Sequence, residues 1–346
     1  QLNAVLSEIP VRSNDILSRD HHGVSSMLNI GAYIQHIYES RDSSLVWVNG
    51  LRYSYQHLSF EYERNEAFEW PAYFYDGINS HNDALVGISG LNIKKGALRL
   101  KINSGTSFRA PNLDDTAKIR VNNDEITIPN PELKAERIWN NEISIFFEDQ
   151  GINLGATFYH TQAYDAITRV FSSLPDGSTF FIAQGDTLAV TSNDNVQRAN
   201  IQGLSLSVDS KLSDSWHFSG QWNMQIGKVI ERNEVHQPLG HIPPTFANAT
   251  LGYKTSLWNL QLNCRYNAWK RIEDYGGSVD NPELATPDGT PSFLVLGLNA
   301  EYQHNNNWSL NAGVNNIFDK HYRAFASGVS GPGRHLFISL NYHWSN

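Results

Sequence analysis

Hydrophobic and polar positions alternate with a period of two along much of this chain. Near the C-terminus an apolar set alternates with a mostly polar or small set over residues 335–343; the apolar set is Leu336, Ile338, Leu340, Tyr342 and Trp344. A period of two places successive side chains on opposite faces of a β-strand. We therefore predict a strand here with one apolar face and one mostly polar face, preceded by a similar strand over 307–316.

The same alternation predicts twelve further strands. Together with 334–344 and 307–316, the predicted strands are 25–39, 45–63, 83–93, 97–108, 138–148, 151–164, 195–211, 214–229, 246–255, 257–269 and 292–304, with another at 1–9. Short turns and long loops alternate between them. The long loops are expected at 10–24, 64–82, 110–137, 165–194, 230–245, 271–290 and 317–333.

This sorting of loop lengths is typical of an up-and-down outer-membrane barrel, whose periplasmic turns are short and extracellular loops long. A soluble sandwich or propeller is not expected to sort its connections in this way. We therefore predict an all-β fold, an antiparallel up-and-down transmembrane β-barrel of 13 or 14 strands. Aromatic residues should form its interfacial girdle near the short turns; they are Trp216, Trp258, Tyr302, Trp308 and Trp344.

Composition narrows the class further. The 346 residues have a mean hydropathy of -0.41 and contain no run of roughly 18 apolar residues, which excludes membrane helices. The net charge of -9 argues against a nucleic-acid partner. The single cysteine, Cys264, cannot form an internal disulfide and lies on an apolar alternation. Gln1 begins no signal peptide, so we expect a chain that is mature, trimmed or lacking its N-terminal part.

Four segments resemble motifs of the TonB-dependent outer-membrane receptors. They are 31–35 with 48–53 ("Y-V-Q-D … G-L-R-Y"), 107–113 ("F-R-A-P-N-L"), 130–136 ("N-P-x-L-x-P-E") and 313–322 with 331–334 (the terminal hairpin). The residues that carry the match are Phe108, Arg109, Ala110, Pro111, Asn130, Pro131, Leu133, Asn316, Phe318, Asp319, Tyr322, Gly333 and Arg334. Two positions depart from the family: Ala135 stands where proline is usual, and the chain ends after Trp344 rather than on phenylalanine.

The resemblance implies a 22-strand barrel plugged by an N-terminal domain. Residues 1–346 would then be the C-terminal portion of the barrel, with a weakly defined strand and external loop over 1–24 and barrel strands and loops over 25–346. The plug and the earliest strands would be missing. Implied partners are the TonB–ExbB–ExbD motor (through the plug), a small-molecule metal chelate, membrane lipid and lipopolysaccharide. No resident cofactor is expected.

The best candidate for ligand contact is an aromatic external loop that contains Trp70, Tyr73, Phe74 and Tyr75. Such rings bind planar ligands or chelates by stacking and apolar contact; packing between loops is the competing interpretation. Arg109 is expected to pair with Asp114 or Asp115 in a structural role, with ligand contact as the alternative.

Histidine positions bear on the cargo. Haem receptors of the family use a histidine between the two boxes, and the interval 112–129 has none. The loop histidines are interpreted as solvated, and no metal site is predicted; they are His21, His22, His81, His236, His241 and His321. We also find no nucleophile elbow, metal motif or phosphate loop that would indicate an enzyme.

The predicted function is therefore TonB-dependent import of a scarce nutrient across the bacterial outer membrane. A ferric siderophore is the favoured cargo, with haem, cobalamin or a glycan as alternatives. Two other classes stay open: a degenerate receptor or docking barrel that does not transport, and a passive porin.

Overall fold

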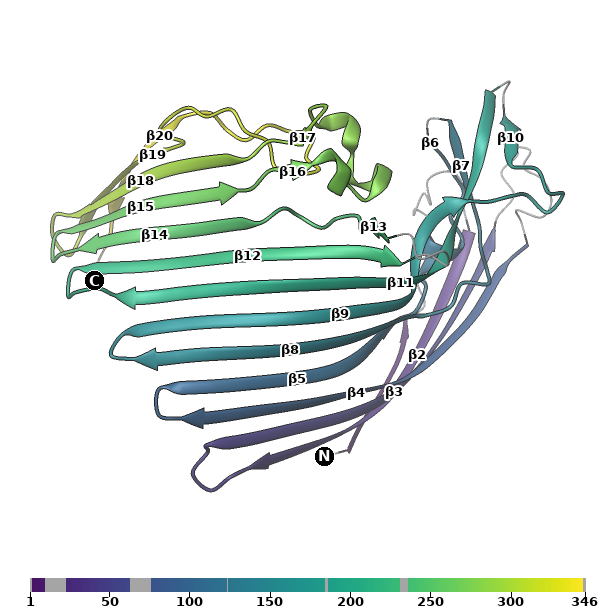
Figure 1. Ribbon diagram of the computed structural model, residues 1–346, viewed down its shortest axis with the longest axis horizontal. Helices are drawn as coiled ribbons and strands as arrows, with labels where there is room; N and C mark the ends of the chain where they lie inside the picture. The colour runs from purple at the N-terminus through teal and green to yellow at the C-terminus, as the bar shows by residue number, and fades with distance from the viewer. Residues whose placement is uncertain are drawn as a thin grey trace.

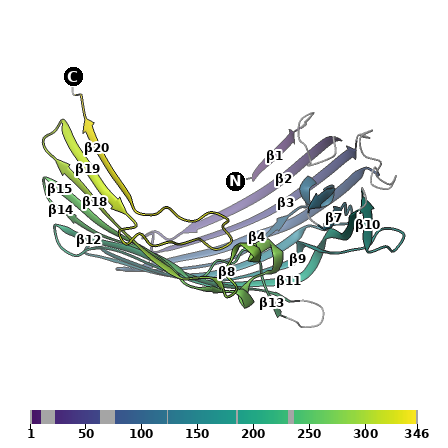
Figure 2. The same ribbon diagram turned by 90° about the horizontal axis from the view of Figure 1, so that it is seen from above.

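The computed structural model describes residues 2–9, 23–62, 76–122, 124–183, 186–230 and 236–344. Fourteen long strands form one antiparallel sheet in which each strand pairs with its neighbours along the chain. The sheet curves into a trough whose outermost strands are β1 and β20 (Figures 1 and 2). In the described part of the chain no register pairs these two strands.

The long strands are β1 (Leu2–Ile9), β2 (Gly23–Glu39), β3 (Leu45–Tyr62), β4 (Ile78–Lys95), β5 (Leu98–Arg109), β8 (Glu136–Asp149), β9 (Ile152–Phe171), β11 (Asp186–Lys211), β12 (Trp216–Ile230), β14 (Phe246–Lys254), β15 (Trp258–Asn267), β18 (Phe293–Gln303), β19 (Trp308–Asn315) and β20 (His335–Tyr342). Every predicted strand is present, and the predicted antiparallel, all-β fold is confirmed.

Three strands extend by five or more residues into segments predicted as loops. β4 begins at Ile78 rather than 83, β9 continues to Phe171, and β11 begins at Asp186 rather than 195. The loop prediction is therefore wrong for 78–82 and for parts of 165–194. These extensions lie beyond the apolar alternation, where backbone pairing continues (Phe60 with Ile78, Phe171 with Thr191) although neither face is uniformly greasy.

The long loops contain short elements that the sequence did not reveal. They are α1 (Leu113–Thr116), β6 (Arg120–Asn122), β7 (Glu125–Ile128), β10 (Phe180–Ala183), β13 (His236–Pro238), β16 (Lys270–Arg271), η2 (Ile272–Asp274), η3 (Gly277–Asp280), η4 (Pro282–Leu284) and β17 (Gly289–Thr290). None of the helices in the described residues is long and apolar enough to cross a membrane.

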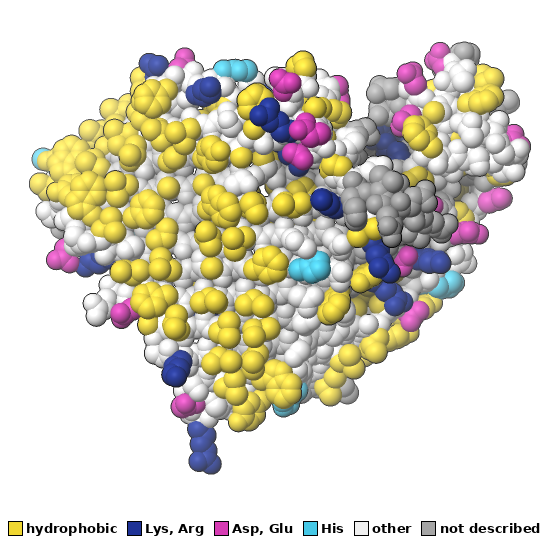
Figure 3. Space-filling model, viewed as in Figure 1, with side chains coloured by type: hydrophobic (Ala, Val, Ile, Leu, Met, Phe, Trp, Pro, Cys, Tyr) yellow, Lys and Arg dark blue, Asp and Glu magenta, His cyan; other side chains and the backbone are white. Residues whose placement is uncertain are grey.

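The convex face of the sheet is the apolar one. Figure 3 views this face and shows hydrophobic side chains spread over most of the strands. Leu298 and Ile338 on it are 43 % and 73 % exposed, as expected for side chains that face lipid rather than a protein core. Register places Cys264 on the same face, opposite Ala249 and Leu296.

Aromatic pairs mark the short-turn edge of this face. Trp216 packs against Tyr253, Trp258 against Tyr302 and Trp308 against Tyr342 with tilted rings, whose centroids are 4.8, 4.8 and 4.6 Å apart. Each tryptophan is the first residue of its strand, and each tyrosine is its cross-strand partner. These pairs form the interfacial girdle that the sequence predicted.

The girdle also gives the tilt of the strands. Tyr253 is the register partner of Leu260, and Trp258, which opens the next pair, is two residues nearer the turn. Likewise, Tyr302 is the register partner of Leu310, and Trp308 is two residues nearer the turn than Leu310. A shift of two residues over two strand spacings corresponds to a tilt of about 35°, which lies within the range of outer-membrane barrels.

On β2–β11 one register row of the convex face is polar throughout. It contains His36, Asn49, Ser89, Ser104, Asn141, His160 and Gln202. Side chains in the row bond to each other and to indole N–H groups: Ser104 donates to Asn141 (2.8 Å), and Trp139 Nε1 donates to Ser104 (3.0 Å).

This row crosses the membrane span obliquely. Asn49 is four residues beyond the first residue of β3, Ser104 six beyond that of β5, and His160 eight beyond that of β9. The step is again two residues for each hairpin, as the tilt requires. The polar row is therefore closer to the short turns at β3 than at β9.

Candidate functional site: the long-loop rim

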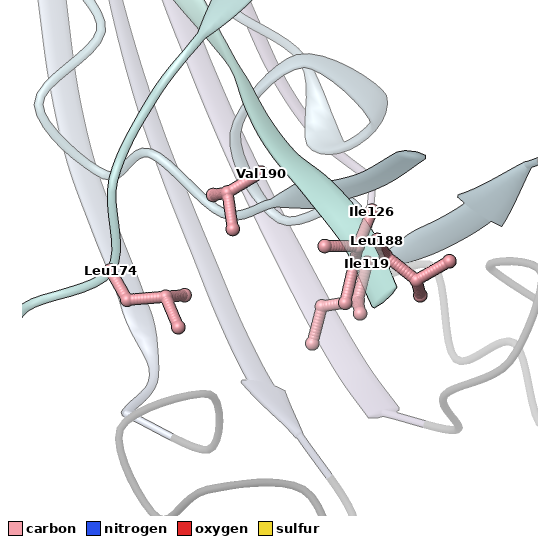
Figure 4. Packing of buried hydrophobic residues seen from close by; sticks show 5 residues of the cluster. All are labelled: Ile119, Ile126, Leu174, Leu188 and Val190. Carbon is pink, nitrogen blue, oxygen red and sulfur yellow. The ribbon is translucent and has the colours of Figure 1, made fainter. Parts of the chain in front are cut away.

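The loops at the long-loop end gather into two folded lobes. The first lobe comprises residues 110–135 and 166–195. Within it β7 pairs in parallel with β11, from Glu125 opposite Ala189 to Ile128 opposite Ser192. A small hydrophobic core fills it (Figure 4), made of Ile119, Ile126, Leu174, Leu188 and Val190.

A second cluster joins this lobe to the sheet. Phe60 and Ile78, at the upper ends of β3 and β4, pack with Ala117 of the loop, and all three are nearly fully buried. The Tyr62 hydroxyl donates to the Ala117 carbonyl at 2.6 Å. The loop after β5 therefore folds over the concave side of β3 and β4 instead of standing free in solvent.

Arg109 connects the two family boxes. Its Nε binds Glu136 and its guanidinium NH1 binds Asp115, each at 2.5 Å. Arg109 and Glu136 are register partners at the end of β5 and the start of β8. The expected pair with Asp115 is present, whereas Asp114 lies 3.7 Å from Lys118. Because two carboxylates hold the guanidinium, the geometry supports the structural role; ligand contact by Arg109 stays a prediction.

The second box holds the loop through hydrogen bonds between the Asn130 side chain and the backbone. The Asn130 amide nitrogen donates to the Asn193 carbonyl (2.9 Å), and its Oδ1 accepts from the Glu132 N–H (3.0 Å). Pro111 is fully buried and Leu133 is 4 % exposed, while Pro131 lies exposed in a turn. Ala110 is half-buried next to Pro111, and Phe108 is half-buried at the upper end of β5. These motif residues therefore fix the shape of the first lobe.

The second lobe comprises residues 236–245, 268–292 and 317–334. Asp280 is completely buried in it and accepts the backbone N–H groups of His241 (2.6 Å) and Gly276 (2.7 Å). Lys270 is also buried, 5.3 Å from the ring centre of Phe325. Burial lowers the pKa of Lys270, an effect that the negative charges of Asp274 and Asp280 oppose.

The terminal motif closes the last long loop on itself. Asn316 has a φ of 51°, and its amide nitrogen donates to the carbonyls of Lys320 (2.9 Å) and Pro332 (3.0 Å). Asp319 accepts the N–H of Arg334 at 2.6 Å, and a side chain at Gly333 would clash with the same carboxylate.

Two other residues of the terminal motif differ in burial. Tyr322 stacks on Phe293 at 4.6 Å, whereas Phe318 is 73 % exposed. The ring of Tyr322 therefore fixes the loop to β18, and Phe318 makes no comparable anchor.

Exposed cationic and aromatic groups lie on the second lobe. Arg271 stands over the ring of Trp269 at 4.4 Å, and the Trp269 indole donates to the Asp288 carbonyl (3.1 Å). A cleft of about 250 Å³ lies between residues 284–293 and 320–323 and is lined in part by Lys320, His321 and Arg323. The sequence analysis missed this group because nothing in the pattern of 268–292 indicates which loop residues turn outward.

Several predicted residues lie outside the described part of the chain. These are the aromatic candidates Trp70, Tyr73, Phe74 and Tyr75 and the histidines His21 and His22. In the described residues no group of three or more His, Cys, Asp or Glu side chains could hold a metal ion. His81 instead stacks on His57 across β3 and β4, with ring centroids 4.4 Å apart.

A curved antiparallel sheet with one apolar face, strands tilted by about 35° and folded long loops is the architecture of an outer-membrane barrel. The family model described as "TonB dependent receptor-like, beta-barrel" matches residues 10–317. The chain belongs to the TonB-dependent receptors. As a TonB-dependent receptor β-barrel it is a protein of the bacterial outer membrane, in agreement with the predicted family, fold and localisation.

Curated relatives agree with this assignment. The chain is 27 % identical over 227 residues to the ferric enterobactin receptor of Pseudomonas aeruginosa, covering 61 % of this chain and 30 % of the relative. It is 24 % identical over 240 residues to the iron-regulated outer membrane virulence protein of Vibrio cholerae, covering 68 % and 36 %. The chain thus spans about a third of the length of these relatives.

Solved structures share the fold. The copper transporter OprC superposes with a TM-score of 0.70 at 19 % identity, over 92 % of this chain and 50 % of that one. The ferric-catecholate import receptor Fiu from K12 E. coli gives 0.66 at 15 % identity, over 94 % and 46 %. At these identities the likeness establishes the receptor fold and carries no information about cargo.

Proposed function

We propose that this receptor imports a ferric siderophore across the outer membrane, driven by the TonB–ExbB–ExbD motor. Captured ligand would pass through the barrel when the motor remodels the plug. The proposal involves transport without a catalytic step, and its partners are the motor, the chelate and the surrounding lipid.

The observation that carries the proposal is the exposed pairing of Arg271 with Trp269 on a lobe held rigid by buried contacts. Ferric chelates of siderophores are commonly anionic and contain aromatic or planar groups. A guanidinium beside an indole offers such a ligand charge-assisted hydrogen bonds and stacking. Two of the similar proteins, from Pseudomonas aeruginosa and Escherichia coli, are ferric enterobactin receptors, which supports the same class of cargo.

Uptake of radioactive iron tests this proposal. A deletion strain that expresses the full-length receptor should accumulate iron from ferric siderophores in a TonB-dependent way. The Arg271→Gln variant should raise the half-saturating concentration about tenfold, the equivalent of one lost charge-assisted contact. Arg99→Gln, at the short-turn end of β5, is the matched control and should leave uptake unchanged.

Other arms distinguish the alternatives. Haem and haemoglobin serve as one arm because the Haemophilus ducreyi relative is named as a haemoglobin-binding protein. Cobalamin serves as another. Accumulation of haem or cobalamin but not of ferric chelates would overturn the siderophore proposal. Absence of all uptake would favour a barrel that does not transport, and uptake without TonB would favour a passive pore.

A further inference from the structure

Three cations lie together on the lipid-facing side of the sheet: Arg137 at the long-loop end of β8, Lys228 near the long-loop end of β12, and Arg198 midway along β11. Register runs from Arg137 through Tyr164 to Arg198 along one row, and Lys228 lies in the next row opposite Asn200. All three cations are exposed. Figure 3 shows Lys and Arg side chains near this end of the strands.

These cations have no acidic partner in the described residues. No carboxylate of the described chain lies within 4.0 Å of Arg137, Arg198 or Lys228, although Asp165 and Asp194 lie nearby on β9 and β11. Within the described residues, the Arg198 guanidinium lies over the Tyr164 ring, 5.5 Å from its centre. The net charge of the protein is -9, yet this group of positive charges is unpaired, so it attracts an anionic ligand.

The depth of this row matches the headgroup level. Tyr164 is twelve residues beyond Ile152, the first residue of β9. At about 3.3 Å per residue and a tilt of about 35°, the row lies about 30 Å above the short-turn edge. The apolar band of such barrels is about 25 Å tall, so the cations lie just above the hydrocarbon of the outer leaflet.

An apolar groove lies directly beside Arg137, at one end of this group of cations. The ladder between β4 and β5 ends at Ile88 opposite Gly105. Above this point the strands leave a groove of about 280 Å³, lined among others by Leu85, Phe108, Trp139, Arg137 and Tyr164. Leu85 is 65 % exposed and Trp139 43 %. The groove can take a hydrocarbon chain whose polar end reaches Arg137.

We propose that this surface binds a phosphorylated lipid of the outer leaflet, with phosphate at Arg137, Arg198 and Lys228 and an acyl chain in the groove beside Leu85. Arginine's planar fork suits phosphate, and lysine adds a point charge. Neighbouring strands lie about 4.8 Å apart, so the cations span about 15 Å from β8 to β12, wide enough for a headgroup that carries two phosphates. This site depends on the outer-membrane location and not on the identity of the imported cargo.

The test measures binding of bis-phosphorylated lipid A to the full-length receptor in detergent, by native mass spectrometry. The triple variant Arg137→Gln, Arg198→Gln, Lys228→Gln should bind about 100-fold more weakly, at roughly fivefold for each charge. The control is Lys94→Gln, Lys95→Gln, Lys254→Gln, which removes three exposed charges at the opposite edge and should bind as the wild type does. Heat-modifiable gel mobility verifies that each variant is folded.

Two further arms identify the chemistry. Leu85→Trp, which fills the groove and keeps every charge, should weaken binding of the acylated lipid. Lipid A without phosphates should bind the wild type and the triple variant equally weakly. Equal binding of both lipids by the wild type, full binding by the triple variant, an equal loss in the control triple, or complete displacement by inorganic phosphate would each overturn the proposal.

Discussion

At the scale of single residues, the family motifs act by holding backbone. Arg109 ties the start of one loop to its end through Glu136 and Asp115. Asn316 does the same for the last loop through the carbonyls of Lys320 and Pro332. Both positions were found from the sequence because they lie in segments that resemble the motifs of the family. The positive φ of Asn316 is known only from the structure.

Replacing Arg109 tests the first of these ties. Arg109→Gln leaves the carboxylates of Glu136 and Asp115, whose side chains are only 14 % and 17 % exposed, without a cation. Because the arginine itself is partly exposed and screened, we expect a loss of about 1–3 kcal/mol in the free energy of unfolding. Arg99→Gln breaks the more exposed pair with Glu148 and should cost under about 1 kcal/mol. Equal denaturation midpoints for the two variants would contradict the assigned role.

Two substitutions at Asn316 separate its backbone and side-chain roles. Asn316→Gly keeps the positive φ but removes the bonds to Lys320 and Pro332, which should cost about 1–3 kcal/mol. Asn316→Ala should cost about 1 kcal/mol more, because a Cβ disfavours φ of 51°. Urea denaturation of the refolded barrel measures both. If the glycine variant matched the wild type, the side-chain bonds would have no stabilising role.

At the scale of elements, the strands that face lipid could be predicted and the folded loops could not. β18, β19 and β20 alternate cleanly because one face must be apolar, so their bounds agree with the sequence to within two residues. Beyond the membrane this requirement ends. The extension of β11 to Asp186 is stabilised by pairing with β7 and β10, contacts between distant segments that leave no local pattern.

The second lobe offers a test at this scale. Asp280→Ala removes the acceptor for two partly buried N–H groups, those of His241 and Gly276. Each unsatisfied group costs about 1–3 kcal/mol, so the lobe should open locally. Hydrogen exchange should rise in 236–245 and 276–290 while β14 and β15 stay protected. Glu283→Ala, an exposed residue of the same loop, is the control and should leave exchange unchanged.

At the scale of the whole molecule, the apolar band crosses the register rows at the angle of the strand tilt. One register row therefore lies at different depths on different strands: Asn49 is four residues beyond the first residue of β3, whereas His160 is eight beyond that of β9. Sequence alternation reveals which side of a strand faces outward. It does not reveal the depth of a residue, because depth depends on the register shift accumulated over all preceding hairpins.

Two arginine substitutions on the convex face test this oblique band. Phe158→Arg places a charge in a row of apolar residues and should destabilise the barrel by about 2–4 kcal/mol in lipid. Gln202→Arg lies next to this row on the neighbouring strand, at the long-loop side, and should cost only about 0–1 kcal/mol. Folding equilibria in lipid vesicles measure both. Equal costs would show that the two residues lie at the same depth.

The constant two-residue step between successive Trp–Tyr pairs bears on how such barrels change in strand number. Since every hairpin meets the bilayer edge in the same relation to the one before it, gene duplication or loss of a whole hairpin would keep the aromatic ring unbroken. Only the circumference would change, because barrel diameter grows with strand number at fixed tilt. Insertion of a single strand, by contrast, would turn every later loop to the opposite side of the membrane.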